Sequence, residues 1–499
     1  MERKNFIKTS VILGTASLAA PLLTIADTKV RVSSHSPSTG TLFFERVFDP
    51  TLAQTSYVIA SMETKEALVV DPKRDIDTYL DIAKQNGLKI TKVTETHIHA
   101  DYLSGAQELA SATGAELILS GETDPDWSYH IPHSPIKDGQ QFQLGRIIVE
   151  AIHTPGHTPE SMTFLLTDLS LSNKPQKALT GDFIFIGDVG RPDLLEKVAQ
   201  QHGTQDKGAR QLFASLQRFS KLHDGIEIWP GHGAGSFCGK ALSDAPTSTL
   251  KDEKQNSKAF HFKDENSFVK YILDGQPDPP KYFAVMKQQN RLPRPLHIQL
   301  PQAAKLSTRQ FLKARENGLV IVDTRIPGTV VKGFVPGSLH IEGSNSFATF
   351  MGSLLDYSLQ FVLISDERSI EDLTRKLTRI GMDNIYGYVA DIESLGLPLS
   401  SSDTVDKATF KSLLGNKDVQ VIDVRSENEY KSGNIPYVEN IPFSHLDENL
   451  KKINRDKTVI VHCKSGTRAN MAYSILKRNG IENVKVYLGT IDEFVTNSH

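Results

Sequence analysis

The 499-residue chain contains only two cysteines, Cys238 and Cys463. So few thiols exclude a disulfide framework and any zinc or iron–sulfur module built from several cysteines, and each thiol becomes a candidate for chemistry. The chain also lacks an excess of either charge, since 56 lysines and arginines face 59 aspartates and glutamates, for a formal net charge of −3. This balance argues against nucleic acid and against a polybasic membrane patch as partners.

Long apolar runs are scarce as well. The apolar stretch 11–23 is too short to span a bilayer as a helix, which needs about 20 residues. The basic start, this apolar stretch and the small residue Ala26 predict an export signal over residues 1–26, followed by a polar tether over 27–40. The pair Arg3-Lys4 resembles a twin-arginine signal with one lysine replacement, and the Sec route is the alternative. We therefore expect an exported, periplasmic protein without a membrane span after signal removal, with a cytoplasmic location as the alternative.

Short strand-like and helix-like patterns alternate between residues 41 and 245 and predict a mixed α/β domain. The length predicts about three domains at about 150 residues each. Residues 246–300 are polar and rich in proline, and they indicate an extension and linker with one helix near residues 266–273.

The remainder of the chain contains an internal repeat. The pentapeptide Ile-Val-Asp-Thr-Arg at 321–325 matches Val-Ile-Asp-Val-Arg at 421–425, and a Gly-x-x-Pro follows each copy at the same distance. We therefore expect two copies of one parallel α/β domain, over 301–398 and 402–499. The Asp and Arg of each pentapeptide are expected to form a structural ion pair.

Histidines and aspartates follow several predicted strands of the first domain. The order is His-x-His-x-Asp, then His, then Asp, then His, and the residues are His97, His99, Asp101, His157, Asp182 and His232. In extended backbone alternate side chains share a face, so we expect His97, His99 and Asp101 to converge. Imidazoles and carboxylates gathered in this way form a site for zinc, iron or manganese.

This ordered set resembles the metallo-β-lactamase superfamily, which implies an αβ/βα sandwich over residues 41–245. The run Gly-Asp-Val-Gly-Arg-Pro-Asp at 187–193 resembles the persulfide dioxygenase branch. Dinuclear zinc hydrolases of the superfamily, such as glyoxalase II, place a histidine directly after the aspartate of the first motif. Here that position is Tyr102, whose pKa of about 10 makes it a poor ligand for a second metal.

The resemblance implies one Fe(II) per chain, held by His97, His157 and Asp182. It leaves His99, Asp101, Tyr102 and His232 to orient the ligands, water or substrate. A mononuclear zinc site of His97, His99 and His157 is the competing assignment.

Two further residues are candidates for handling substrate or sulfur. Arg191 follows the glycine-rich turn and either neutralises a substrate carboxylate or forms a structural ion pair. Cys238 lies in Gly-Ala-Gly-Ser-Phe-Cys-Gly-Lys, a pattern that resembles dioxygenase–rhodanese fusions. It either passes on sulfur or fills space in the core. Lys240 is expected to lower the pKa of this thiol.

Cys463 follows the apolar strand 458–462 and precedes a predicted helix from residue 469. Backbone N–H groups at such a position stabilise a thiolate or a persulfide anion. The segment resembles the rhodanese active loop, which implies catalytic roles for Cys463 and Arg468. A phosphatase loop has one residue more between its Cys and Arg, so the spacing favours sulfur transfer. The first repeat has Ser365, Asp366 and Glu367 at this place and cannot carry a persulfide.

The sequence therefore predicts an α/β multidomain protein, a sandwich followed by two rhodanese-like domains of which only the second is active. The expected activity is oxidation of a low-molecular-weight persulfide by O2 to sulfite, coupled to sulfur transfer to or from thiosulfate in sulfide detoxification. The alternative is a glyoxalase II-like zinc hydrolase fused to a sulfurtransferase. A homo-oligomer is possible.

Overall fold

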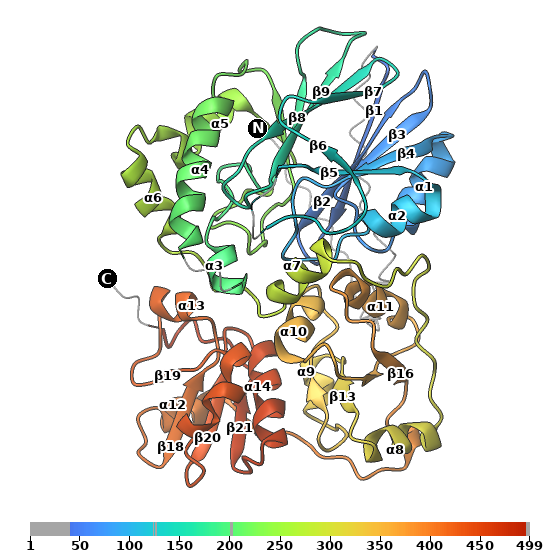
Figure 1. Ribbon diagram of the computed structural model, residues 1–499. Helices are drawn as coiled ribbons and strands as arrows, with labels where there is room; N and C mark the ends of the chain where they lie inside the picture. Colours follow the sequence, from blue (N-terminus) through green and yellow to red (C-terminus); the bar gives the residue numbers. More distant parts are fainter. Residues whose placement is uncertain (1–39, 123, 125–126, 200–202, 496–499) are drawn as a thin grey trace, which may run out of the picture.

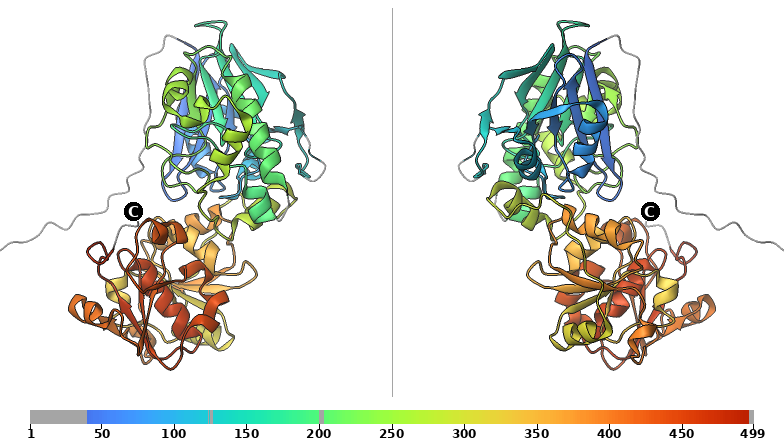
Figure 2. Two further views of the ribbon diagram at one scale, coloured as in Figure 1. Left: turned by 90° about the vertical axis from the view of Figure 1, so that its left-hand side faces the viewer. Right: turned by 90° about the vertical axis from the view of Figure 1, so that its right-hand side faces the viewer.

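The computed structural model describes residues 40–122, 124, 127–199 and 203–495. The predicted export signal and its tether up to residue 39 lie outside the described residues. The chain forms two lobes, with the first domain in the upper lobe and both repeats in the lower lobe (Figures 1 and 2). Among the described residues, no helix combines the length and the apolar character needed to cross a membrane.

The upper lobe is built around two six-stranded sheets. The first has the order β1-β2-β3-β4-β5-β6, and the second has the order β12-β11-β10-β9-β8-β7. The strands are β1 (Leu42–Asp49), β2 (Gln54–Ser61), β3 (Glu66–Val70), β4 (Lys89–Thr94), β5 (Glu116–Ser120), β6 (Ser134–Ile136), β7 (Gln141–Leu144), β8 (Ile147–His153), β9 (Met162–Asp168), β10 (Lys177–Gly181), β11 (Glu227–Pro230) and β12 (Ser248–Thr249).

Alternation along the strands explains why the two sheets face each other. In β2, Tyr57 and Ile59 enter the core between the sheets, whereas Val58 and Ala60 enter the core beneath the outer helices. The helices of this lobe are α1 (Asp77–Asn86), α2 (Ala106–Thr113), α3 (Leu194–Ala199), α4 (Thr204–Phe219), α5 (Leu250–Asn256) and α6 (Glu265–Leu273). Helices therefore cover the outer face of each sheet, and the expected αβ/βα sandwich is confirmed.

The lower lobe contains two parallel sheets with the orders β14-β13-β15-β16 and β17-β21-β20-β18-β19. The strands are β13 (Val320–Asp323), β14 (Leu339–His340), β15 (Phe361–Ile364), β16 (Ile385–Val389), β17 (Thr404–Val405), β18 (Val419–Asp423), β19 (Glu439–Asn440), β20 (Thr458–His462) and β21 (Val484–Tyr487). The main helices are α8 (Thr308–Glu316), α9 (Pro327–Val330), α10 (Phe347–Leu354), α11 (Ile370–Arg379), α12 (Lys407–Leu413), α13 (Glu427–Ser432) and α14 (Thr467–Arg478). Apart from the edge strand β17, the two orders are the same.

The repeated Asp and Arg have the same role in both copies. Arg325 pairs with Asp323 and Arg425 pairs with Asp423, each with a shortest N–O distance of 2.6 Å. Each arginine also donates to the carbonyl of the glycine eight residues later, at 2.8 Å. The pair thus closes the turn after the first central strand of each domain.

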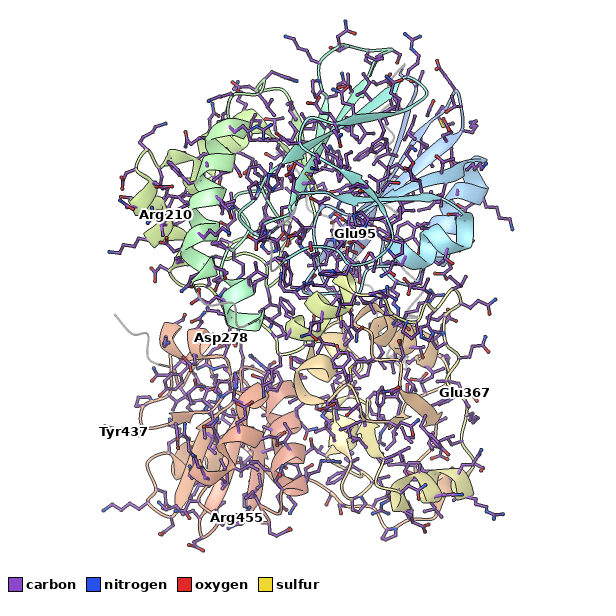
Figure 3. All side chains as sticks on the ribbon, in the orientation of Figure 1. Glu95, Arg210, Asp278, Glu367, Tyr437 and Arg455 are labelled. Atoms are coloured by element: carbon purple, nitrogen blue, oxygen red, sulfur yellow. The ribbon has the colours of Figure 1, made fainter. Side chains whose placement is uncertain are left out.

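The segment 246–300 is more structured than the sequence indicated. Besides the expected helix α6, it forms α5 and a third helix, α7 (Phe283–Arg291). Helix α7 lies at the junction of the two lobes (Figure 1), and Asp278 of the same segment lies there too (Figure 3). Phe283 and Met286 join an apolar cluster that includes residues of the upper lobe and of both repeats. Buried apolar residues at helical spacing therefore make this segment part of the domain interface.

A buried ion pair fixes the first repeat to the upper lobe. The guanidinium of Arg379 contacts Asp75 at 2.6 Å and Asp49 at 3.1 Å. The carbonyl of Arg379 also accepts the N–H of Leu103 at 2.7 Å, directly after the first histidine motif. The repeat that lacks cysteine thus touches the loop carrying the predicted metal ligands.

Replacing Arg379 by Met is expected to destabilise the junction by about 3–5 kcal/mol, because the buried carboxylate of Asp49 loses its ion pair and that of Asp75 loses its shortest one. The matched control is Lys92→Met, which breaks the more exposed pair with Glu116 and is expected to cost about 0–1 kcal/mol. Urea unfolding followed by circular dichroism measures both. Equal small losses in the two variants would show that Arg379 does not hold the lobes together.

Candidate functional site

The three predicted ligands and the orienting residue His232 lie in loops at one edge of the sandwich. His97 follows β4, His157 lies between β8 and β9, Asp182 directly follows β10, and His232 follows β11. All four side chains are buried. Glu95, two residues before His97, lies in the lower half of the upper lobe (Figure 3). The sandwich therefore gathers side chains that are far apart in the sequence.

Three of these residues form a compact group. His97 Nε2, His157 Nε2 and a carboxylate oxygen of Asp182 all lie within 4.8 Å of one another. The distances to Asp182 Oδ2 are 3.7 Å from His97 Nε2 and 3.5 Å from His157 Nε2. None of the three atoms has a hydrogen-bond partner among the described residues. Buried polar atoms without partners that face one another fit a divalent metal bound by two imidazoles and one carboxylate.

Their protonation suits metal binding. Burial lowers the pKa of His157 to about 4, and it lowers the pKa of His97 well below the ordinary value. Burial alone would raise the pKa of Asp182, but His232 and His97 hold it well below the ordinary value. Near neutral pH the two histidines therefore offer lone pairs and Asp182 is a carboxylate.

The other ring nitrogens of the two histidines are held by the protein. His97 Nδ1 lies 3.0 Å from Thr96 Oγ1, and His157 Nδ1 lies 2.9 Å from the carbonyl of Arg191. When Nδ1 carries the proton and donates it to such an oxygen, Nε2 keeps its lone pair for a metal, and the hydrogen bond fixes the orientation of the ring.

His97 and His99 of the first motif lie close together, with their ring centres 4.2 Å apart. Residues 95–103 form an irregular loop rather than extended strand, and the three side chains reach different partners. His97 joins the metal group, His99 Nε2 lies 3.0 Å from Asp71 Oδ1, and Asp101 Oδ2 lies 2.7 Å from His232 Nε2. The expected extended backbone is not what brings His97 and His99 together, because bends in the loop replace the two-residue repeat of a strand.

His232 lies between two carboxylates, with Nδ1 2.7 Å from Asp182 and Nε2 2.7 Å from Asp101. These carboxylates outweigh burial and raise the pKa of His232 well above its ordinary value. The histidine therefore positions Asp182 by hydrogen bonding. Asp101, His232 and Cys238 also lie within 4.8 Å of one another, but both ring nitrogens of His232 are already engaged.

Tyr102 stands where a dinuclear site would have a ligand. Its hydroxyl donates to the carbonyl of Asp71 at 3.1 Å, and burial raises its pKa well above the ordinary value. Tyr102 therefore remains a neutral hydrogen-bond donor, which favours one metal rather than two.

The glycine-rich turn is required by close packing. A Cβ on Gly190 would lie 1.8 Å from the carbonyl of Asp182 and 3.2 Å from the Cβ of His157. Only glycine permits the turn to pass so close to two predicted ligands.

Arg191 forms a structural ion pair. Its guanidinium contacts Asp193 through two bonds of 2.7 Å and donates to the carbonyl of Pro277 at 2.6 Å, and the side chain is fully buried. The alternative of a structural pair therefore accounts for this arginine, and its charge is already neutralised.

Cys238 is buried beside the metal group. Burial, with added effects of Asp182 and Asp101, raises the pKa of its thiol well above the ordinary value. Lys240 donates instead to the carbonyl of Tyr271 at 2.6 Å and lies over the ring of that tyrosine. The prediction that Lys240 lowers this pKa is wrong, since carboxylates face the thiol and the lysine is engaged elsewhere.

Sequence analysis missed two residues of α7. Asn290 donates to the carbonyls of His99 and Tyr102 at 2.9 and 2.8 Å, and so fixes the first motif. Lys287 is buried, and burial lowers the pKa of its ammonium group although Glu160, Cys238 and Asp182 oppose this effect. The available signal was the helical spacing of Phe283, Met286 and Asn290 within a segment interpreted as a linker.

The second candidate site is the loop between β20 and α14. The N–H of Gly466 donates to Cys463 Sγ at 3.0 Å, and the thiol is buried. Arg468 pairs with Glu429 at 2.5 and 2.8 Å. Burial would raise the pKa of Glu429, but this pairing lowers it to about 2. A substrate anion must therefore compete with Glu429 for Arg468.

In the first repeat the corresponding loop is filled by its own acidic side chain. Asp366 Oδ1 accepts the N–H groups of Arg368 and Ser369 at 2.9 and 3.1 Å. A carboxylate thus takes the donors that a bound anion would need, in agreement with the missing cysteine.

Comparisons with known proteins match both sites. The model of the metallo-β-lactamase superfamily matches residues 49–232, and the model of the rhodanese-like domain matches residues 406–497. The crystal structure of a metallo-β-lactamase from Staphylococcus aureus subsp. aureus COL is 36% identical, with a TM-score of 0.64, over 70% of this chain and 100% of that one.

Two curated relatives cover the upper lobe. The mitochondrial persulfide dioxygenase ETHE1 of Bos taurus is 30% identical over 185 residues, 36% of this chain and 67% of that protein. The probable polyketide biosynthesis zinc-dependent hydrolase BaeB of Bacillus velezensis is 25% identical over 222 residues, 42% of this chain and 91% of that protein.

Measurement of bound metal should distinguish the two proposed ligand sets, which differ in whether Asp182 or His99 is the third ligand. We expect Asp182→Asn to lose the metal, and His99→Asn to keep it with an affinity about 10–100-fold lower, because His99 orients rather than binds. Metal content per chain after dialysis, measured by mass spectrometry, checks this, with the exposed His261→Asn as control. Metal retained by Asp182→Asn but lost by His99→Asn would instead favour His97, His99 and His157.

Proposed function

As this chain belongs to the metallo-β-lactamase superfamily and ends in a rhodanese-like domain, we propose that it is a persulfide dioxygenase coupled to a sulfurtransferase. Its relatives support an enzyme of sulfur metabolism. In this proposal the upper lobe oxidises a low-molecular-weight persulfide, such as glutathione persulfide, with O2 to sulfite. The second repeat then exchanges sulfur with thiosulfate, and the pathway served is sulfide detoxification.

The observation that carries the proposal is the group of His97 Nε2, His157 Nε2 and Asp182 Oδ2, buried and without other partners. Two imidazoles and one carboxylate leave coordination positions open, as non-haem iron oxygenases require. Fe(II), when bound there, supplies the electron chemistry by which O2 reacts with sulfur.

The protein's own residues hold this centre in place. The carbonyl of Arg191 orients His157, His232 orients Asp182, and Asn290 fixes the loop that carries His97. Burial of the site excludes bulk water and strengthens every electrostatic interaction within it.

Sulfur transfer is assigned to Cys463. Its thiolate attacks the outer sulfur of a persulfide, the S–S bond breaks, and the departing thiolate takes the proton of the persulfide. Sulfite then attacks the outer sulfur of the Cys463 persulfide, forms thiosulfate and releases the Cys463 thiolate. The N–H of Gly466 stabilises the Cys463 thiolate at Sγ before the attack and again after its release. The reverse sequence uses thiosulfate as the sulfur donor.

The placement of the two sites favours their coupling. Helix α13 follows the carboxyl end of β18 and lies at the top of the lower lobe, toward the upper lobe (Figure 1). In a parallel sheet the carboxyl end of β20, where Cys463 follows, lies at the same edge. Fusion in one chain raises the concentration of one site at the other.

A second candidate function is a zinc-dependent hydrolase fused to the sulfurtransferase. The similarity to BaeB, which covers most of that protein, favours it. Two tightly bound zinc ions per chain and cleavage of a thioester would support this alternative.

We also propose export to the periplasm, on the basis of the basic and apolar start of the chain. A cleaved N-terminus near residue 26 in the periplasmic fraction is the expected result. An intact N-terminus in the cytoplasm would contradict it.

Addition of glutathione persulfide to the Fe(II)-loaded protein should cause rapid O2 uptake and formation of sulfite or thiosulfate. An oxygen electrode and ion chromatography measure the two. Iron-loaded protein that consumes no O2 with glutathione persulfide or with other small persulfides would contradict the dioxygenase assignment and direct attention to thioesters.

The two activities should be separable by mutation. Cys463→Ser should abolish sulfur transfer to sulfite and leave O2 uptake within about twofold, whereas His157→Ala should do the opposite, because each removes a group used at one site only. The matched control for the thiol is Ser465→Ala in the same loop, which leaves Cys463 in place. Equal loss of both activities in both variants would contradict a two-site enzyme.

A further inference from the structure

Lys287 is a buried lysine on the helix that contacts the first histidine motif. Its side chain projects from α7, in the segment outside the superfamily match, and only 1% of the residue is exposed. Its Nζ has no hydrogen-bond partner among the described residues. Burying an ammonium without such a partner costs stability. A buried ammonium group at this position therefore has a role other than stabilising the fold.

The charge of Lys287 acts on the metal centre from close by. It is attracted to Glu160, Cys238, Asp182 and Asp101, and it also affects His97 and His157 by lowering their pKa values. These six residues comprise the three predicted ligands and their neighbours. The geometry agrees, because Asn290, one turn further along the same helix, donates to the carbonyls of His99 and Tyr102 in the metal loop.

The surroundings hold Lys287 in position without neutralising it. Its Nζ lies 5.1 Å from the centre of the Trp127 ring, and Arg291 lies over the same ring at 4.6 Å. The opposite charge on Glu160 attracts Nζ, yet no ion pair within 4.0 Å forms between these two described residues. Glu160 Oε1 is instead held by the N–H of Ile98 at 2.8 Å.

We propose that Lys287 is a substrate-binding residue that holds the negative charge of a small sulfur anion at the metal centre. The anions are the perthiolate that enters and the sulfite that leaves. An ammonium offers three N–H donors and suits both a terminal sulfur and an oxyanion. This inference rests on the proposed function and names the chemistry by which that site selects its substrate.

Sulfite binding tests the proposal without relying on catalysis. The chain has two tryptophans, so a Trp229→Phe background leaves Trp127, beside Lys287, as the only tryptophan reporter. Titration of the metal-loaded, anaerobic protein with sulfite should change the fluorescence of Trp127 in a saturable way. Lys287→Met should weaken this binding at least 10-fold, and Lys287→Arg should retain part of it because the charge remains.

The matched control is Lys376→Met, which removes another buried lysine, one that is paired with Asp372 in the first repeat. Its sulfite affinity should equal that of the parent protein. Lys287→Met should fold with an unchanged or higher melting temperature, since it removes a buried charge. Lys287→Gln serves as a second neutral variant should Met fail to fold.

Wild-type affinity in both neutral variants, or no saturable response in the parent protein, would overturn the proposal. In steady-state assays Lys287→Met should raise KM for the persulfide more than it lowers kcat. If the protein shows no O2 uptake but still binds sulfite in a way that depends on Lys287, the anion-binding role of Lys287 stands. Only the dioxygenase assignment is then refuted.

Discussion

The candidate metal centre depends on how Asp182 divides its two carboxylate oxygens. Oδ1 accepts a hydrogen bond from His232, and Oδ2 faces His97 and His157 without a partner. Because one oxygen of the carboxylate is held by a hydrogen bond, the other oxygen points in a fixed direction. It faces the two histidine nitrogens and so provides the third ligand atom. The loops after four strands must therefore meet at one carboxylate, and the glycine-rich turn must pass close to it.

The repeat without cysteine has become part of the first domain's support. Its active loop is closed by Asp366, whereas Arg379 reaches two buried carboxylates of the upper lobe. Helix α7 completes the junction, because one face joins the shared apolar cluster and its polar residues hold the first histidine motif. Loss of sulfur chemistry in this copy thus coincides with a structural role at the other site.

Much of the fold and of the metal group could be predicted from the sequence. Alternating strand-like and helix-like patterns predicted a mixed α/β first domain, and the spacing of the histidines and aspartates predicted the residues that lie together. The motif also resembles a known superfamily, so its placement at strand ends could be anticipated. The paths of the side chains of His99 and Asp101 could not, since they depend on bends in an irregular loop.

The contributions of Lys287 and Asn290 were hidden for a different reason. Both lie in a polar, proline-containing segment, and their contacts, such as Asn290 with His99 and Lys287 with Trp127, are with residues far earlier in the chain. The periodicity of a sequence indicates which residues share one face of a helix, but it does not indicate which part of the protein that face contacts. Arg191 is the opposite case: this charged residue in a glycine-rich turn was a candidate for substrate binding, and its ion pair with Asp193 gives it a structural role instead.

The hydrogen bond from Leu103 to the carbonyl of Arg379 also orders events during synthesis. The metal loop receives this support only after the first repeat has emerged from the ribosome. At about 5–20 residues per second, the intervening chain takes roughly 14–55 s to translate. Throughout that interval the nascent histidine motif lacks its final anchor. A metal ion that arrives in that interval therefore meets a loop without this hydrogen bond.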